Sequence, residues 1–165
     1  MAPVQPVRSR VASPTGTGFK SVPGLFDVPL PPNEQQPLQD RVNQLVAIAA
    51  GGALGALLRF WVATGVAAWL GKDFPYGTLL INVTGSLAIG FLYVLLLERF
   101  DGGAVWRAFL MIGLLGAFTT FSTFSLETVN LIEAGEGMKA LVNVLLSVVL
   151  CVGAAAIGIV IGRQV

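Results

Sequence analysis

The chain has 165 residues and a formal net charge of +1, with 55% hydrophobic and only 12% charged residues. This composition is too apolar for an ordinary soluble domain and predicts a membrane protein. The charge balance and the lack of a basic run give no reason to expect a nucleic-acid partner. With no histidine and one cysteine, the chain offers no catalytic triad and no metal cluster, so we expect a protein that is not an enzyme.

Residues 1–40 differ in composition from the rest of the chain. They contain eight of the nine prolines, together with scattered serine, glutamine and charged residues. Such a segment buries too little apolar surface to offset its ordering entropy. We therefore expect a disordered, proline-rich cytoplasmic tail over 1–40 and one membrane domain over 41–165.

Four long apolar stretches follow, at about 44–70, 77–98, 104–132 and 138–162. The charged residues cluster mainly between these stretches. A helix rises ~1.5 Å per residue, so each stretch is long enough to cross a hydrocarbon core of roughly 30 Å. The sequence predicts an all-α membrane protein with four transmembrane helices.

The third stretch contains the segment GLLGAFTTFSTFSLE at 113–127, in which five of the seven residues from Thr119 to Ser125 carry hydroxyls. Unsatisfied polar groups are costly in lipid, so these hydroxyls are expected to face protein, a cavity or an ion. Gly113 and Gly116 weaken the middle of this helix. We expect a break near 116–120, with a continuous helix whose hydroxyls bond their own backbone as the alternative.

Glycines in the membrane helices indicate close helix packing. Gly52–Ala56 and Gly158–Gly162 have the small-xxx-small spacing that lets two backbones approach in lipid. Four short helices with several such faces suggest an oligomer, most simply a dimer.

Three motifs carry a family resemblance: GGALGALLRF at 51–60, GTLLINVTGSLAIG at 77–90, and GLLGAFTTFSTFSLE at 113–127. In this order they resemble the Fluc (CrcB) family of small fluoride channels, over about residues 46–163. The resemblance implies passive export of fluoride across the plasma (inner) membrane of a prokaryotic cell. It also implies an antiparallel dimer with a structural sodium ion (Na⁺) at the interface, bound by the backbone carbonyls of Gly116 and Thr119.

The resemblance also implies an ion pathway. Phe121 and Phe124 match a pair of pore phenylalanines, whose positive ring edges suit an anion. Asn82 is expected to donate its amide to the anion, with interhelical hydrogen bonding as the alternative. The remaining pathway residues are Ser122, Thr123 and Ser147. Asn143 stands where the family pattern has a tyrosine; its amide can donate as a phenol does, but it lacks the ring.

Two charged residues are assigned to a vestibule. Arg59 either lines it or extends to the interface. Glu127 is expected to face water near the end of the third helix, in a vestibule or structural role. The basic residues Arg41, Arg99, Arg107 and Arg163 lie on the side of the termini, against Lys72 and Lys139 opposite. This bias predicts that both termini are cytoplasmic. An antiparallel homodimer needs the same chain in both orientations, so the partner is either a second copy of the chain or an oppositely oriented paralogue.

Two other classes of function compete with a channel. A proton-coupled small multidrug exporter needs a carboxylate in its first helix, and residues 42–72 contain no Asp or Glu. A non-transporting assembly subunit gives no reason for the cluster of hydroxyls and phenylalanines. The channel is therefore the preferred function.

Overall fold

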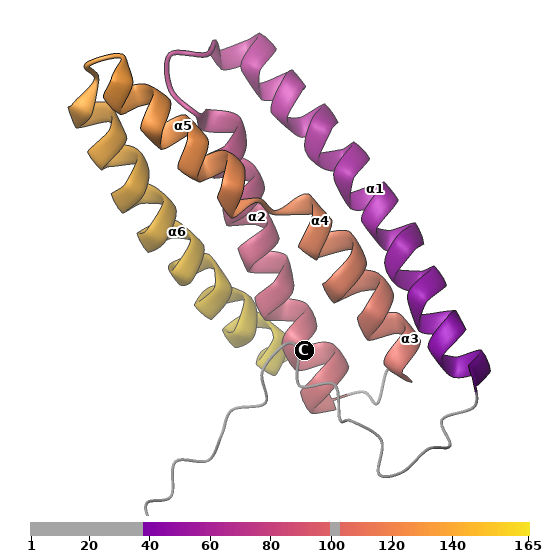
Figure 1. Ribbon diagram of the computed structural model, residues 1–165. Coiled ribbons are helices and arrows are strands. Elements are labelled where there is room, and N and C mark those ends of the chain that lie inside the picture. Colours follow the sequence, from indigo (N-terminus) through magenta and orange to yellow (C-terminus); the bar gives the residue numbers. More distant parts are fainter. Residues whose placement is uncertain (1–37, 100–102) are drawn as a thin grey trace, which may run out of the picture. The chain divides into compact units, whose positions relative to one another are not determined.

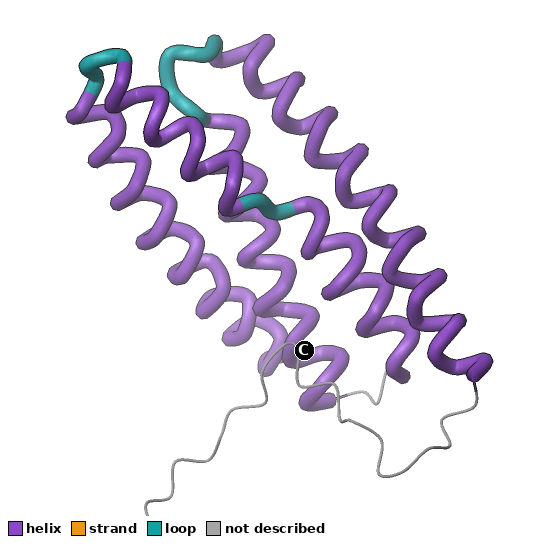
Figure 2. The backbone as a smooth tube through the Cα atoms, in the orientation of Figure 1, coloured by secondary structure: helices purple, strands orange, loops and turns teal. Residues whose placement is uncertain are grey.

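The computed structural model describes residues 38–99 and 103–165. In this part of the chain four helical segments are long and apolar enough to cross a membrane: Leu38–Leu70, Tyr76–Arg99, Gly103–Glu133 and Gly137–Gln164. The predicted all-α class and the four spans are confirmed (Figures 1 and 2). Almost all of the predicted tail lies outside the described residues, and helix already begins at Leu38.

The helices divide the four spans as follows: α1 (Leu38–Leu70); α2 (Tyr76–Tyr93) with a π-helical continuation η1 (Val94–Arg99); α3 (Gly103–Arg107), a π-helical segment η2 (Ala108–Leu115), α4 (Gly116–Phe118) and α5 (Phe121–Glu133) in the third span; and α6 (Gly137–Gln164). The third span thus consists of several helical segments, whereas the first and fourth spans are each a single helix, α1 and α6.

The helices pack as two neighbouring pairs. The most extensive contact joins α2 to α6, and the next joins α1 to η2 and α4. The piece after Thr120 changes partner, because α5 contacts α6 (Figure 1). The third span therefore crosses from one pair to the other between α4 and α5.

Few large side chains are fully buried in the described chain: Ile81, Met111, Val94 and Asn143. Many large apolar side chains are exposed, such as Trp69 at 92%. This pattern is expected of a membrane domain, because lipid is as apolar as a protein core and apolar side chains gain nothing from leaving it. Helix association must then depend on close backbone packing.

Glycines allow this close packing at both helix pairs. A Cβ at Gly90 would overlap the Ala155 carbonyl on α6, and a Cβ at Gly158 would overlap the Leu87 carbonyl on α2. On α1, a Cβ at Gly55 would likewise overlap the Leu114 carbonyl. Gly52 makes no such contact among the described residues, because nothing lies within 4 Å of a Cβ there. The packing face of α1 is set by the neighbouring Gly51 and Gly55 instead.

We expect Gly90→Ala to destabilise the fold by about 1–3 kcal/mol, because the added methyl must push a backbone away. Gly153 on α6 is the matched control, since a Cβ there meets nothing within 4 Å. Gly153→Ala is expected to leave stability unchanged or slightly higher, because alanine favours helix. Thermal unfolding in detergent measures both variants, and equal unfolding temperatures for the two would contradict the packing described here.

The turn between α5 and α6 explains why the chain reverses there. Gly135 has a positive φ of 78°, which alanine would adopt only with strain. The Gly135 N–H donates to the Ile132 carbonyl at 3.0 Å, and the Glu136 N–H donates to the Leu131 carbonyl at 2.8 Å. This pair of bonds is a Schellman motif, which ends the helix and satisfies its last carbonyls.

Candidate ion pathway

The centre of the third span has two consecutive residues in extended conformation. Helix α4 ends at Phe118, Thr119 has φ −77° and ψ 157°, and Thr120 has φ −153° and ψ 115°. Helix α5 then begins at Phe121, with the Thr120 hydroxyl accepting a hydrogen bond from the Thr123 N–H at 3.2 Å. A threonine in this position is a favourable N-cap, so the local sequence itself promotes a new helix start.

Asn82 of α2 holds this extended segment from the side. Its Nδ2 donates to the Thr120 carbonyl at 3.0 Å, and its Oδ1 accepts from the Thr120 N–H at 2.8 Å. One amide side chain thus satisfies both polar groups of one peptide residue. These groups lie near the middle of a membrane span, where water cannot readily replace the amide. The two hydrogen bonds therefore stabilise the extended backbone at Thr120.

The same hydrogen bonds leave two carbonyls without their usual helical donors. In a continuous helix, the Gly116 carbonyl would accept from the Thr120 N–H and the Thr119 carbonyl from the Thr123 N–H. Here the Thr120 N–H binds Asn82, and the Thr123 N–H binds the Thr120 hydroxyl. Both carbonyls are therefore available to another partner, and carbonyl oxygens suit small hard cations.

The two phenylalanines of the motif lie on the first turn of α5. Their ring centroids are 5.3 Å apart and the ring planes are inclined by 46°. Phe121 is 78% exposed, whereas Phe124 is only 9% exposed. One ring thus lies inside the described chain and the other projects from it, so Phe121 contributes little to the packing of this chain by itself.

Hydroxyl groups cluster beside these rings. The Thr120 Oγ1 donates to the Thr123 Oγ1 at 3.0 Å and lies 3.2 Å from the Ser122 Oγ. Ser122 and Thr123 are both exposed on α5. The cluster presents several neutral hydroxyls and no charge, next to the two carbonyls and the Asn82 amide.

Comparisons with known proteins place the chain in a family. The family described as CrcB-like protein, Camphor Resistance (CrcB), matches residues 46–159. This match covers more than half of the chain. The chain belongs to the CrcB-like family.

Relatives of this CrcB-like chain are named fluoride-specific ion channels (FluC). The one from Methylococcus capsulatus is 58% identical over 120 residues, or 73% of this chain and 53% of the relative. Those from Hydrogenovibrio crunogenus and Coxiella burnetii are 48% and 49% identical, and the aligned regions span 93% and 99% of their lengths. The chain thus spans about half of the first relative and nearly all of the other two. Their names are those of channels, in agreement with the prediction that the CrcB-like chain is not an enzyme.

Most of the predicted site residues of this CrcB-like protein lie close together. The extended segment and the turns on either side of it hold Gly116, Thr119, Phe121, Ser122, Thr123 and Phe124, and Asn82 contacts this segment. Ser147 is separate, buried on α6. The roles assigned to these residues stay predictions.

A second polar contact was missed in the sequence. Asn143 of α6, 2% exposed, donates its Nδ2 to the Thr128 Oγ1 at 2.9 Å, and Thr128 donates to the Phe124 carbonyl at 2.7 Å. Ser147 lies four residues after Asn143, on the same helical face. The spacing of four residues between Phe124 and Thr128 was the available signal, since it places both on one face of α5.

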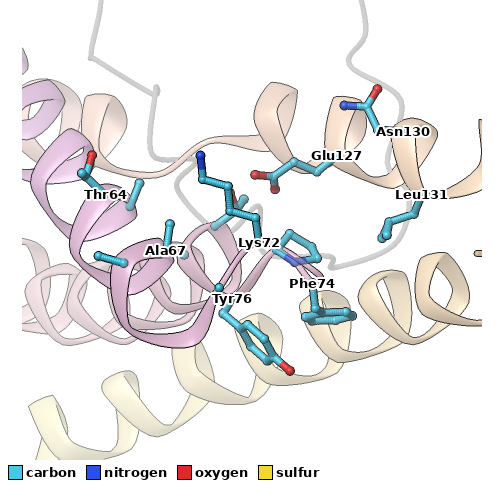
Figure 3. Close-up of a pocket in the computed structure, with 14 residues that line it drawn as sticks. Thr64, Ala67, Lys72, Phe74, Tyr76, Glu127, Asn130 and Leu131 are labelled. Atoms are coloured by element: carbon cyan, nitrogen blue, oxygen red, sulfur yellow. The ribbon is translucent and has the colours of Figure 1, made fainter. Parts of the chain in front are cut away.

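The two predicted vestibule residues, Glu127 and Arg59, do not line the same cavity. Glu127 lines a cavity of about 650 Å³ between α1, the α1–α2 turn, the start of α2 and α5 (Figure 3). Its Oε2 is buried and has no hydrogen-bond partner among the described residues. Arg59 is half-buried on α1 and is not among the residues lining this cavity, so its vestibule role stays a prediction. The buried Thr78, which the sequence did not single out, lines the cavity together with Glu127.

Proposed function

We propose that this chain is a fluoride-selective channel that lets fluoride leave the cell passively down its gradient. The observation that carries the proposal is the cluster of hydroxyl, amide and ring-edge groups at the interrupted centre of the third span, in a chain whose relatives are named fluoride-specific ion channels.

The chemistry of the cluster suits a small, strongly hydrated anion. Fluoride gives up its water only if several short hydrogen-bond donors replace it, and hydroxyl and amide groups do this without a fixed charge. No Lys or Arg occurs between Gly77 and Glu98 or between Ala108 and Asn130. Binding is then weak enough for release, which conduction requires. The proposed route passes Asn82, Phe121, Ser122, Thr123 and Phe124, with Ser147 along α6.

The proposed working unit is an antiparallel dimer. Its support is the polar face of α4 and α5, where Gly116, Phe121, Ser122 and Thr123 are all exposed in the single chain. Polar groups at membrane depth need a protein partner or water. A second chain in the opposite orientation would bring the same face against the first and enclose the route between them.

A structural sodium ion fits the released carbonyls of Gly116 and Thr119. Within the described residues no group of three or more His, Cys, Asp or Glu side chains could hold a metal, so backbone oxygens are the donors at hand. Two carbonyls from each of two chains would give the ion four oxygen ligands. When bound, the ion supplies fixed positive charge near the anion route and joins the two interrupted spans.

The orientation of the partner follows from the charges at the two ends. Arg41, Arg99, Arg107 and Arg163 outnumber Lys72 and Lys139 at the opposite ends of the spans. This bias favours one orientation, with both termini in the cytoplasm, so an oppositely oriented paralogue is a partner to test beside a homodimer. The proposed location is the plasma (inner) membrane of a prokaryotic cell.

The direct test of the function is fluoride release from liposomes that contain the purified chain, with chloride as the comparison ion. Fluoride release without chloride release is expected. A chain that moves neither ion, alone and with its paralogue, would end the proposal.

A further inference from the structure

The cavity around Glu127 has charged residues on opposite walls. Glu127 projects from α5, and Lys72 comes from the turn between α1 and α2 (Figure 3). Its remaining walls are apolar or neutral, such as Ala63, Ala67, Thr78 and Asn130. Lys72 and Glu127 therefore set the electrostatic potential that an ion meets there.

The turn itself directs Lys72 to the cavity. Gly71 ends α1 with a positive φ of 79°, and its N–H donates to the Ala67 carbonyl at 3.1 Å. Pro75 immediately precedes α2 as its N-cap residue, and both Gly71 and Pro75 line the cavity with Lys72. The acidic neighbour Asp73 is not among the lining residues. The basic residue of this turn, Lys72, thus lines the cavity, whereas the acidic residue, Asp73, does not.

An ionised Glu127 opposes the entry of anions into this cavity. A cavity that contained Glu127 alone would repel anions, and its low-dielectric walls would strengthen the repulsion. Lys139 lies in the first turn of α6, at the same end of the spans, but it pairs with Glu136 at 3.1 Å and does not line the cavity. Among the described residues Lys72 is therefore the cation placed to offset Glu127.

We propose that Lys72 is the anion-recruiting residue of this cavity. It offsets the negative field of Glu127 and raises the concentration of small anions in the cavity. The lining residues Thr78 and Glu127 lie four residues from Asn82 and Thr123 on the same helices, so the cavity adjoins the proposed route. Lys72 acts on the rate at which anions arrive and not on the choice between fluoride and chloride, which depends on the neutral donors deeper in the span. This inference rests on the proposed channel function.

The test compares Lys72→Gln, Lys72→Arg and the matched control Lys139→Gln by unitary fluoride currents in planar bilayers. At an ionic strength of about 0.01 M, Lys72→Gln is expected to lower the conductance about threefold to tenfold. At about 1 M salt the deficit is expected to fall below about twofold, because the Debye length shrinks to roughly 3 Å. Lys72→Arg and Lys139→Gln are expected to match the unchanged chain, and selectivity for fluoride is expected to stay the same in all variants.

Three results would overturn the role of Lys72. They are an unchanged conductance in Lys72→Gln at low salt, a deficit that high salt does not reduce, and an equal deficit in Lys139→Gln. Absence of any fluoride current in the unchanged chain is a different result, because it removes the proposed function itself. The unchanged chain, recorded in parallel, separates the two failures.

Discussion

Asn82→Asp is expected to lower fluoride flux at least about 100-fold, because it removes a donor and adds a like charge, each worth more than about 1.4 kcal/mol. The aspartate keeps an oxygen for the Thr120 N–H but faces the Thr120 carbonyl without a proton to donate. Fluoride release from liposomes measures the change.

The control for this substitution is Thr84→Val on the same helix. The Thr84 hydroxyl donates to carbonyls of its own helix, Leu80 at 2.8 Å and Ile81 at 3.2 Å, and among the described residues it bonds to no other span. Thr84→Val is therefore expected to conduct normally. Asn82→Leu separates the two contributions, since it loses both bonds to Thr120 without adding charge. A correctly folded Asn82→Asp protein with normal flux would remove Asn82 from the pathway.

Phe121→Ile is expected to lower flux about twofold to twelvefold, because a ring edge that partners an anion is worth about 0.5–1.5 kcal/mol and isoleucine has none. Stability is expected to change little, since Phe121 is 78% exposed and contributes little to the packing of the single chain. Flux and thermal unfolding in detergent, measured on the same preparation, check both parts.

Phe60→Ile is the matched control, because Phe60 is also an exposed aromatic residue, at 63%, on a different span. We expect it to leave flux and stability unchanged. Phe124→Ile serves less well, since Phe124 is only 9% exposed and its loss would disturb packing as well as the pathway. If Phe121→Ile and Phe60→Ile conduct equally, the exposed ring has no part in conduction.

The four spans could be predicted from the sequence because hydropathy and turn residues agree at most of their ends. The expected end at 70 and start at 77 lie beside Gly71 and Pro75, and the structure has α1 ending at Leu70 and α2 starting at Tyr76. The start of α1 was placed six residues late, at 44. Residues 38–43 are largely polar but still helical. Hydropathy marks the apolar stretch that can lie in the membrane, and it does not detect a polar extension of the same helix.

The arrangement around the third span could be predicted only in part. Gly116 and the threonines after it marked a weak point in a membrane helix, and residues 119 and 120 are extended. The two bonds between Asn82 and Thr120 join residues 38 positions apart, so no local pattern contains them. The π-helical segments η1 and η2 were not predicted either, because a change of helical register depends on the neighbouring helices.

The vestibule shows the same limit. Glu127 was expected to face water, and it lines a cavity with its Oε2 buried. The residues that line this cavity with Glu127 come from α1, the α1–α2 turn and α2, which only the fold brings to α5. Lys72 was counted in the sequence for orientation alone, since its position opposite Glu127 depends on the turn made by Gly71.

The central claim is that the chain conducts fluoride and excludes chloride. The most direct measurement uses liposomes loaded with equal amounts of fluoride and chloride, the purified chain, a potassium ionophore to carry the balancing charge, and an electrode for each anion. Fast fluoride release with the chloride retained until detergent is added is the predicted result. Release of both anions together would contradict fluoride selectivity, and retention of both, with the paralogue present as well, would contradict the channel.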